Sequence, residues 1–301
     1  MTVKTYFLPL LKSWERLTQF QQGVIMALTS NALFVFVGTL VRQISDHISL
    51  FQVLLVRQLV FLLLLVPSLK IAGSSIFKPE ALPLHGLRIL GAFLYLYFGF
   101  VSVSNLPLAD ATALSFTSVL FVALIAKLWL GENVGWKRAL TIFVGFSGIL
   151  LITQPGFDNP KYIYIISGLI AALGGAIAAT CVRKLSQSQP RAILLSYQAF
   201  SVGLITLVPA IANWKWPDWW QTGLLLLIGT LSSLATSAGV ISYQKAPANV
   251  ASNLGYGQIV FALILGYWLF DETPNVLALT GVGLLFGSAL VPFFRQSYLN
   301  K

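Results

Sequence analysis

The sequence predicts an all-α integral membrane protein with ten transmembrane helices, arranged as two inverted five-helix repeats. Three observations lead to this prediction: the composition, the number of membrane-length apolar segments, and a motif that occurs twice. Hydrophobic residues make up 57% of the chain and charged residues only 9%, and the mean hydropathy is +0.82. Because soluble domains carry roughly a quarter of charged residues, this composition excludes a soluble globule.

Eight charge-free segments are each long enough to cross a hydrocarbon core of about 30 Å. They are 17–41, 89–109, 139–157, 162–182, 192–214, 219–244, 246–270 and 273–294. Two further apolar segments carry one charge each: 50–69 contains Arg57, and 111–130 contains Lys127 near its end, where the amine can reach the interface. Together these segments predict ten helices.

A motif that recurs 140 residues along the chain indicates an internal duplication. Pro107, Ala111, Leu114, Phe121 and Glu132 recur as Pro247, Ala251, Leu254, Phe261 and Glu272. An ordered series of matches at a fixed offset is typical of a repeat, so we place the first repeat at residues 1–155 and the second at 156–301. Since five spans is an odd number, the second repeat enters the membrane from the opposite side, and we expect a cavity where the repeats meet.

The positive charges are distributed unevenly between the two sides of the predicted bundle. With the N-terminus inside, fifteen of the 19 Lys and Arg residues lie in cytoplasmic segments, and three, Arg42, Lys161 and Lys215, lie in outer segments. This bias predicts a multi-pass protein of the plasma or bacterial inner membrane with both termini in the cytoplasm. It also explains the net charge of +10 without a nucleic-acid partner. The expected partners are the lipid bilayer and a small-molecule substrate, and a homodimer is left open.

Three short stretches resemble a known transporter family. They are the segment Leu106–Leu114 with the sequence LPLADATAL, the segment Leu130–Glu132, and the segment Gly145–Gly148; the segment Leu269–Glu272 is similar to the acidic end of the family's ninth helix. These stretches resemble EamA-type members of the drug/metabolite transporter superfamily, and the resemblance covers almost the whole chain. It implies ten helices in two inverted repeats, with the substrate of a secondary transporter held between the halves. The family moves varied solutes, so the resemblance does not identify the cargo.

Arg57 is the first candidate binding residue, because an intramembrane charge is unfavourable unless it meets a partner or a wet cavity. It could attract an anionic group of the solute. Alternatively, it could bond backbone carbonyls or pair with Asp46 or Asp110. Its counterpart in the second repeat, Tyr197, is also a candidate.

Polar residues in the predicted ninth and fourth helices are candidates for the cavity wall. Asn253, Tyr256 and Gln258 lie in the ninth helix, and Ser115 and Ser118 lie in the fourth. The two helices are related by the repeat, so their polar faces are expected to meet in one cavity. The alternative is hydrogen bonding between helices.

Three further residues, Asn31, Tyr95 and Tyr97, place polar groups within the first and third spans. The two tyrosines are two residues apart and so point to different faces of one helix. We expect Tyr95, and not Tyr97, to line the cavity.

Residues typical of catalysis, metal binding or cofactor binding do not converge in the sequence. The two histidines, His47 and His85, lie near predicted loops, and Cys181 is the single cysteine. We therefore predict no catalytic residues, metal or cofactor, and favour a transporter over an intramembrane enzyme or a structural membrane subunit. An amino acid, riboflavin or S-adenosylmethionine would suit the polar, carboxylate-poor spans.

Overall fold

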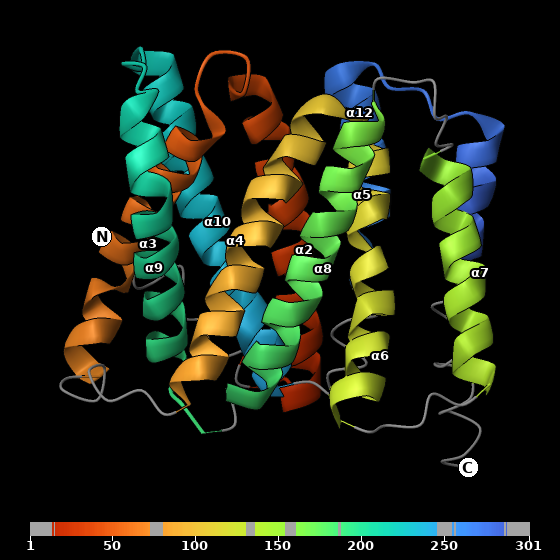
Figure 1. The fold of residues 1–301 in the computed structure, drawn as a ribbon, viewed down its shortest axis with the longest axis horizontal. Coiled ribbons are helices and arrows are strands. Elements are labelled where there is room, and N and C mark those ends of the chain that lie inside the picture. Colours follow the sequence, from red (N-terminus) through yellow and green to blue (C-terminus); the bar gives the residue numbers. More distant parts are fainter. Residues whose placement is uncertain are drawn as a thin grey trace.

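The computed structural model describes residues 14, 16–72, 81–130, 136–153, 161–185, 188–245, 255, 257–285 and 287. Within these residues the secondary structure consists of helices that run along one common direction as a bundle (Figure 1). The predicted repeat boundary at residues 155 and 156 lies outside them.

The helices match the ten predicted spans. In the first repeat they are α2 (Gln19–Ile44), α3 (Leu50–Ala72), α4 (Leu82–Asn105), α5 (Leu108–Ser115), α6 (Thr117–Leu130) and α7 (Trp136–Thr153). In the second repeat they are α8 (Tyr162–Leu185), α9 (Arg191–Ala212), α10 (Trp219–Lys245), α12 (Gly257–Phe270) and a last helix, Val276–Leu285. Six of them, α2, α3, α4, α8, α9 and α10, are long and apolar enough to cross a membrane on their own.

The fourth predicted span is divided into α5 and α6 at Phe116. Two hydroxyl groups flank this break and bond to backbone carbonyls: Ser115 donates to the Thr112 oxygen at 2.6 Å, and Thr117 donates to the Leu114 oxygen at 2.7 Å. Serine and threonine that bond back to their own helix tend to bend it. The two short helices therefore continue one another as a single interrupted span (Figure 1).

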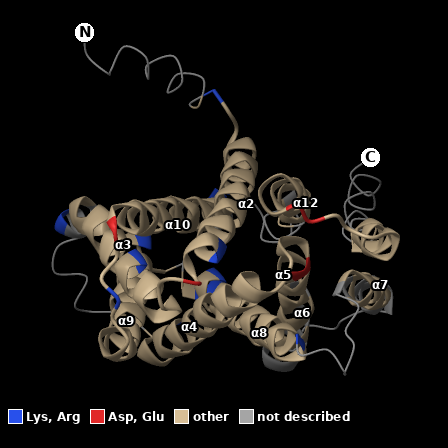
Figure 2. Cartoon of the chain, turned by 90° about the horizontal axis from the view of Figure 1, so that it is seen from above, with Lys and Arg blue, Asp and Glu red and all other residues tan. Residues whose placement is uncertain are grey.

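Contacts between helices follow the relation between the two repeats. The offset of the repeat turns α2 into α8, α3 into α9, α4 into α10, and α6 into α12. The counterpart of α5, at 248–255, lies mostly outside the described residues. When the repeats are exchanged, the pair α2 and α10 becomes the pair α8 and α4, and both pairs are packed together. The pair α3 with α9 is also packed and maps onto itself, and α5 packs on α12 of the other repeat. The repeats thus interlock, and α7 lies at the edge of the bundle (Figure 2).

The outward surface of the bundle is apolar, as a lipid-facing surface must be. Leu63, Val208 and Trp268 are 70%, 74% and 77% exposed. Trp219 and Trp220, which begin α10, are also exposed, and indole rings are enriched at membrane interfaces. Polar groups that bind a solute are therefore expected inside the bundle.

Candidate functional site

A cavity of about 100 Å³ lies between the two repeats. The described part of its wall is built by seven helices: α2, α3, α4 and α5 from the first repeat, and α8, α10 and α12 from the second. One water needs roughly 10–15 Å³ of such space, so the cavity has room for several waters. It occupies the place at which the inverted repeats are predicted to meet.

Arg57 brings a positive charge to the cavity wall from the middle of α3. Its side chain is 1% exposed, and its Nε and Nη1 atoms have no hydrogen-bond partner among the described residues. No salt bridge joins it to Asp46 or Asp110. It is the single charged residue among those that line the cavity, so the guanidinium faces that space without a counter-charge from the described wall.

The two tyrosines of α4 have different surroundings. Tyr95 lines the cavity, and its ring packs so closely on α8 that a Cβ atom added at Gly175 would lie 3.0 Å from the tyrosine Cδ2 atom. Tyr97 instead stacks on the rings of Phe51 and Phe93, with centroid distances of 4.5 and 5.9 Å. The two-residue spacing therefore separates one cavity tyrosine from one packing tyrosine.

Two other predicted residues, Ser115 and Gln258, line the cavity from α5 and α12. The Gln258 Nε2 atom donates a hydrogen bond to the Asn31 Oδ1 atom at 2.7 Å, which ties α12 to α2. Asn31 itself is not among the residues that line the cavity, but it holds the side chain of Gln258, which is.

Of the remaining predicted residues, two are described and lie away from the cavity, and two are not described. Ser118 is not among the residues that line the cavity. Tyr197 lies beside His85, with ring centroids 5.1 Å apart. Asn253 and Tyr256 fall outside the residues that the structure describes, so their place at the site stays a prediction.

Two cavity serines were not predicted as site residues. Ser102 on α4 and Ser232 on α10 are 2% and 1% exposed, they line the cavity, and their hydroxyls have no hydrogen-bond partner among the described residues. Small residues in a span usually indicate close helix packing, and one turn before Ser232 a Cβ atom at Gly229 would indeed lie 2.7 Å from the Val60 Cβ atom. The sequence pattern alone does not separate the packing residue from the cavity residue.

Arg88, directly before the predicted third span 89–109, is a second buried arginine. It lies on α4 and is 1% exposed, its Nη1 donates to the Leu194 carbonyl oxygen, and its Nη2 donates to Gln198 Oε1 at 2.8 Å. Arg57 is therefore not the only buried arginine among the described residues. Because both Nη atoms of Arg88 bond to α9, this arginine ties the two repeats together away from the cavity.

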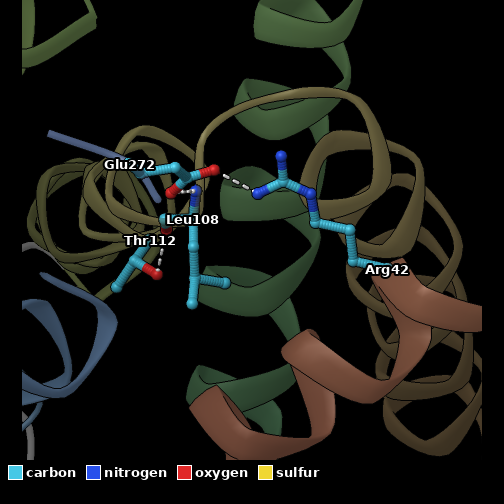
Figure 3. Close-up of polar contacts among 4 residues, drawn as sticks. All are labelled: Arg42, Leu108, Thr112 and Glu272. Atoms are coloured by element: carbon cyan, nitrogen blue, oxygen red, sulfur yellow. Dashed lines mark hydrogen bonds and ion pairs between the residues drawn. The ribbon is translucent and has the colours of Figure 1, made fainter. Parts of the chain in front are cut away.

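A cluster of polar contacts joins the repeats at one end of the cavity (Figure 3). Arg42, in the last turn of α2, forms an ion pair with Glu272, which follows α12. The second carboxylate oxygen of Glu272 accepts a hydrogen bond of 2.9 Å from the backbone N–H of Leu108, the first residue of α5. We refer to Arg42, Leu108 and Glu272 as the latch.

Two further interactions stabilise the latch: the carboxylate of Glu272 lies at the N-terminus of α5, and Arg42 lies over an aromatic ring. The first N–H groups of a helix lack partners within the helix and favour a carboxylate. The Arg42 guanidinium also lies 4.2 Å from the centroid of the Phe270 ring, within the range of a cation–π contact. Leu108 lines the cavity as well, so the latch lies directly at the cavity wall.

Comparison with known proteins agrees with this architecture. The EamA-like transporter family matches residues 21–154 and 162–294. An S-adenosylmethionine uptake transporter from Rickettsia bellii is 26% identical over 262 residues, which cover 85% of this chain and 87% of the relative. A pseudopaline exporter from Pseudomonas aeruginosa is 26% identical over 281 residues, which cover 91% and 96%.

A solved crystal structure supports the fold alone. It aligns with a TM-score of 0.72 and 14% sequence identity, over 94% of this chain and all of that one. The relatives and the apolar helices identify an integral multi-pass membrane protein and a small-molecule transporter, not an enzyme. The two matched segments together cover most of the sequence, one for each repeat, and the chain belongs to the EamA-like transporter family.

Proposed function

We propose that this chain is a secondary transporter that moves a small organic metabolite across the membrane by alternating access. The observation that carries the proposal is the cavity between the repeats, which is bounded at one end by the latch. It holds the guanidinium of Arg57, whose Nε and Nη1 have no hydrogen-bond partner among the described residues. A site at the interface of inverted repeats can be opened to either side when the repeats rock against each other. Arg57, Tyr95, Ser115 and Gln258 are the proposed binding residues in the described wall.

The relatives support a metabolite as cargo, because one is named for S-adenosylmethionine and another for pseudopaline. One of these names describes uptake and the other describes export, so we do not derive a direction of transport from them. Amino acids, riboflavin-like solutes and S-adenosylmethionine-like solutes are the proposed classes.

We further propose that both termini lie in the cytoplasm of a cell whose inner membrane holds the protein. The distribution of Lys and Arg between the loops supports this orientation. The latch then faces the outside, because it lies where α2 ends, α5 begins and α12 ends. Opening the cavity to the outside requires the ion pair of Arg42 and Glu272 to separate.

Counterflow uptake tests the proposed function. Proteoliposomes are loaded with one unlabelled compound and assayed for uptake of the same labelled compound, across amino acids, nucleosides, riboflavin and S-adenosylmethionine. A carrier gives saturable uptake that needs the compound on the inside. A channel gives flux that does not saturate, and protein-free liposomes give the background.

The two tyrosines of α4 provide a matched pair of substitutions. We expect Tyr95→Leu to lower the uptake efficiency of the transported compound about tenfold, since an aromatic contact and a hydrogen-bonding group are both lost from the cavity. Tyr97→Leu removes the same side chain from the stack with Phe51 and should change uptake per folded protein by less than about threefold. Equal effects of the two substitutions would contradict the placement of the site. The measurement is the initial counterflow rate, normalised to monodisperse protein.

A further inference from the structure

We infer that the solute of this transporter carries one carboxylate on an apolar body, and that the carboxylate binds Arg57. This inference rests on the proposed function and names its substrate class. It comes from the charge, the hydrogen-bonding groups and the apolar surface that meet in the cavity.

The positive charge of Arg57 in the cavity wall favours an anionic ligand. Arg57 is fully buried, is the single charged residue in the described wall, and leaves Nε and Nη1 without hydrogen bonds among the described residues. The chain holds nine acidic residues, and none of them lies in the stretch 246–256 that leads into α12. A buried cation is unfavourable without a counter-charge, and a carboxylate matches the planar donors of a guanidinium in a bidentate pair.

Arg88 shows how a structural arginine is held in this bundle. Both of its Nη atoms bond to groups of α9, the Leu194 carbonyl and the Gln198 amide oxygen. Arg57 is buried as deeply, but its Nη1 has no such partner among the described residues. The difference favours a ligand role for Arg57 over a role in holding helices together.

A single positive charge selects for a single negative charge. A phosphate monoester or a dicarboxylate would bring a second negative charge for which the described wall has no cation. The other polar side chains of the described wall are neutral: Tyr95, Ser102, Thr112, Ser115, Ser232 and Gln258. The hydroxyls of Ser102 and Ser232 have no hydrogen-bond partner among the described residues. Hydroxyl and amide oxygens can accept a hydrogen bond from an ammonium, so an amino acid fits as well as a simple monocarboxylate.

The rest of the described wall is apolar and suits a hydrophobic or aromatic body. Phe34, Leu96, Phe100 and Val103 lie on this part of the wall. Ligand pockets commonly combine such a surface with a few polar groups that orient the ligand. Carboxylate-bearing solutes are therefore favoured over riboflavin, which has no carboxylate.

The test measures ligand binding to the purified protein, independently of transport. The unfolding midpoint, Tm, is recorded while three carboxylates are titrated: L-phenylalanine, 3-phenylpropionate and S-adenosylmethionine. The matched probes without a carboxylate are L-phenylalaninamide, 3-phenylpropanamide and decarboxylated S-adenosylmethionine. We expect at least one carboxylate to raise Tm in a saturable way, and its matched probe to raise Tm less at every concentration.

The variants locate the binding group. Arg57→Gln should weaken carboxylate binding at least about tenfold, because a charge-assisted bidentate contact is lost, and Arg57→Lys should retain part of it. Arg183→Gln, an exposed arginine at the end of α8, should bind like the unaltered protein. If Arg57→Gln does not fold, Gly99→Leu gives the second test, since this glycine lines the cavity and its Cβ would have ordinary contacts; the leucine should block carboxylate binding.

The outcomes separate this inference from the proposed function. Equal stabilisation by acids and their matched probes, undiminished binding to Arg57→Gln, or no stabilisation by any of the three carboxylates would overturn the inference. Counterflow of an uncharged compound alongside such a result would leave the carrier proposal standing. Carboxylate binding that depends on Arg57 supports the inference even where counterflow fails, and in that case the carrier proposal falls.

Discussion

Gly91→Leu and Gly174→Leu should each leave little folded protein. The two glycines lie where α4 crosses α8: a Cβ atom at either one would lie 2.7 Å from the carbonyl oxygen of the other. Further backbone atoms lie as close, with the Ala178 nitrogen 2.9 Å from the added Cβ at Gly91. Backbone cannot rotate away as a flexible side chain can, so the helices must separate. We expect a cost of about 3 kcal/mol or more.

The control for this prediction lies on the same helix. A Cβ atom at Gly86 would have no neighbour within 4 Å, so Gly86→Leu should retain a folded bundle. The measurement is the fraction of each variant that elutes as a monodisperse peak in size-exclusion chromatography, together with its Tm. Normal yield and Tm for Gly174→Leu would show that α4 and α8 do not cross as closely as described.

Glu272→Gln should shift the protein toward the state that is open at the latch end. The substitution removes the charge that pairs with Arg42 and weakens the bond to the Leu108 N–H. The Arg42 and Glu272 side chains are 25% and 18% exposed, so solvent screens part of the interaction. We expect the free energy that favours the closed state to fall by about 1–2 kcal/mol. This corresponds to a change of about 5- to 30-fold in the ratio of closed to open protein.

A distance measurement across the latch tests this shift. Spin labels at Asp46 and Thr273, in the loops beside Arg42 and Glu272, report the separation of α2 and α12 in a Cys181→Ala background. The closed distance should dominate in the unaltered protein, and a longer distance should grow in Glu272→Gln. Asp271→Asn is the matched control, because this neighbouring carboxylate is exposed and asparagine tolerates its φ of 52°. If Glu272→Gln and Asp271→Asn gave identical distance distributions, the ion pair of the latch would not control opening at this end.

The helices could be predicted from the sequence because apolar length is a local property. The intramembrane charge of Arg57 and the two-residue spacing of Tyr95 and Tyr97 were sufficient to predict that Arg57 and Tyr95 line the cavity. The break at Phe116 was not predicted, since the hydroxyl bonds that accompany it occur within a continuous apolar segment.

The latch and the burial of Arg88 could not be predicted, because each depends on residues that are distant in sequence. Arg42 and Glu272 are 230 positions apart, and Arg88 and Gln198 are 110 apart. By hydropathy, Arg88 lies just before the apolar segment 89–109 and outside it, whereas packing against α9 buries its side chain. Local patterns identify which residues are unusual, and the packing of the two repeats decides which of them meet.

Reversible closure of the latch tests alternating access most directly. Arg42→Cys and Glu272→Cys are combined with Cys181→Ala, and the two new thiols are joined by a short bis-methanethiosulfonate linker that a reductant removes. The measured quantity is counterflow of whichever compound the unaltered protein accumulates. Under alternating access, linked protein loses counterflow, and reduction restores it to the level of the unlinked variant. Full counterflow by protein that is completely linked would contradict a mechanism in which this end of the cavity must open.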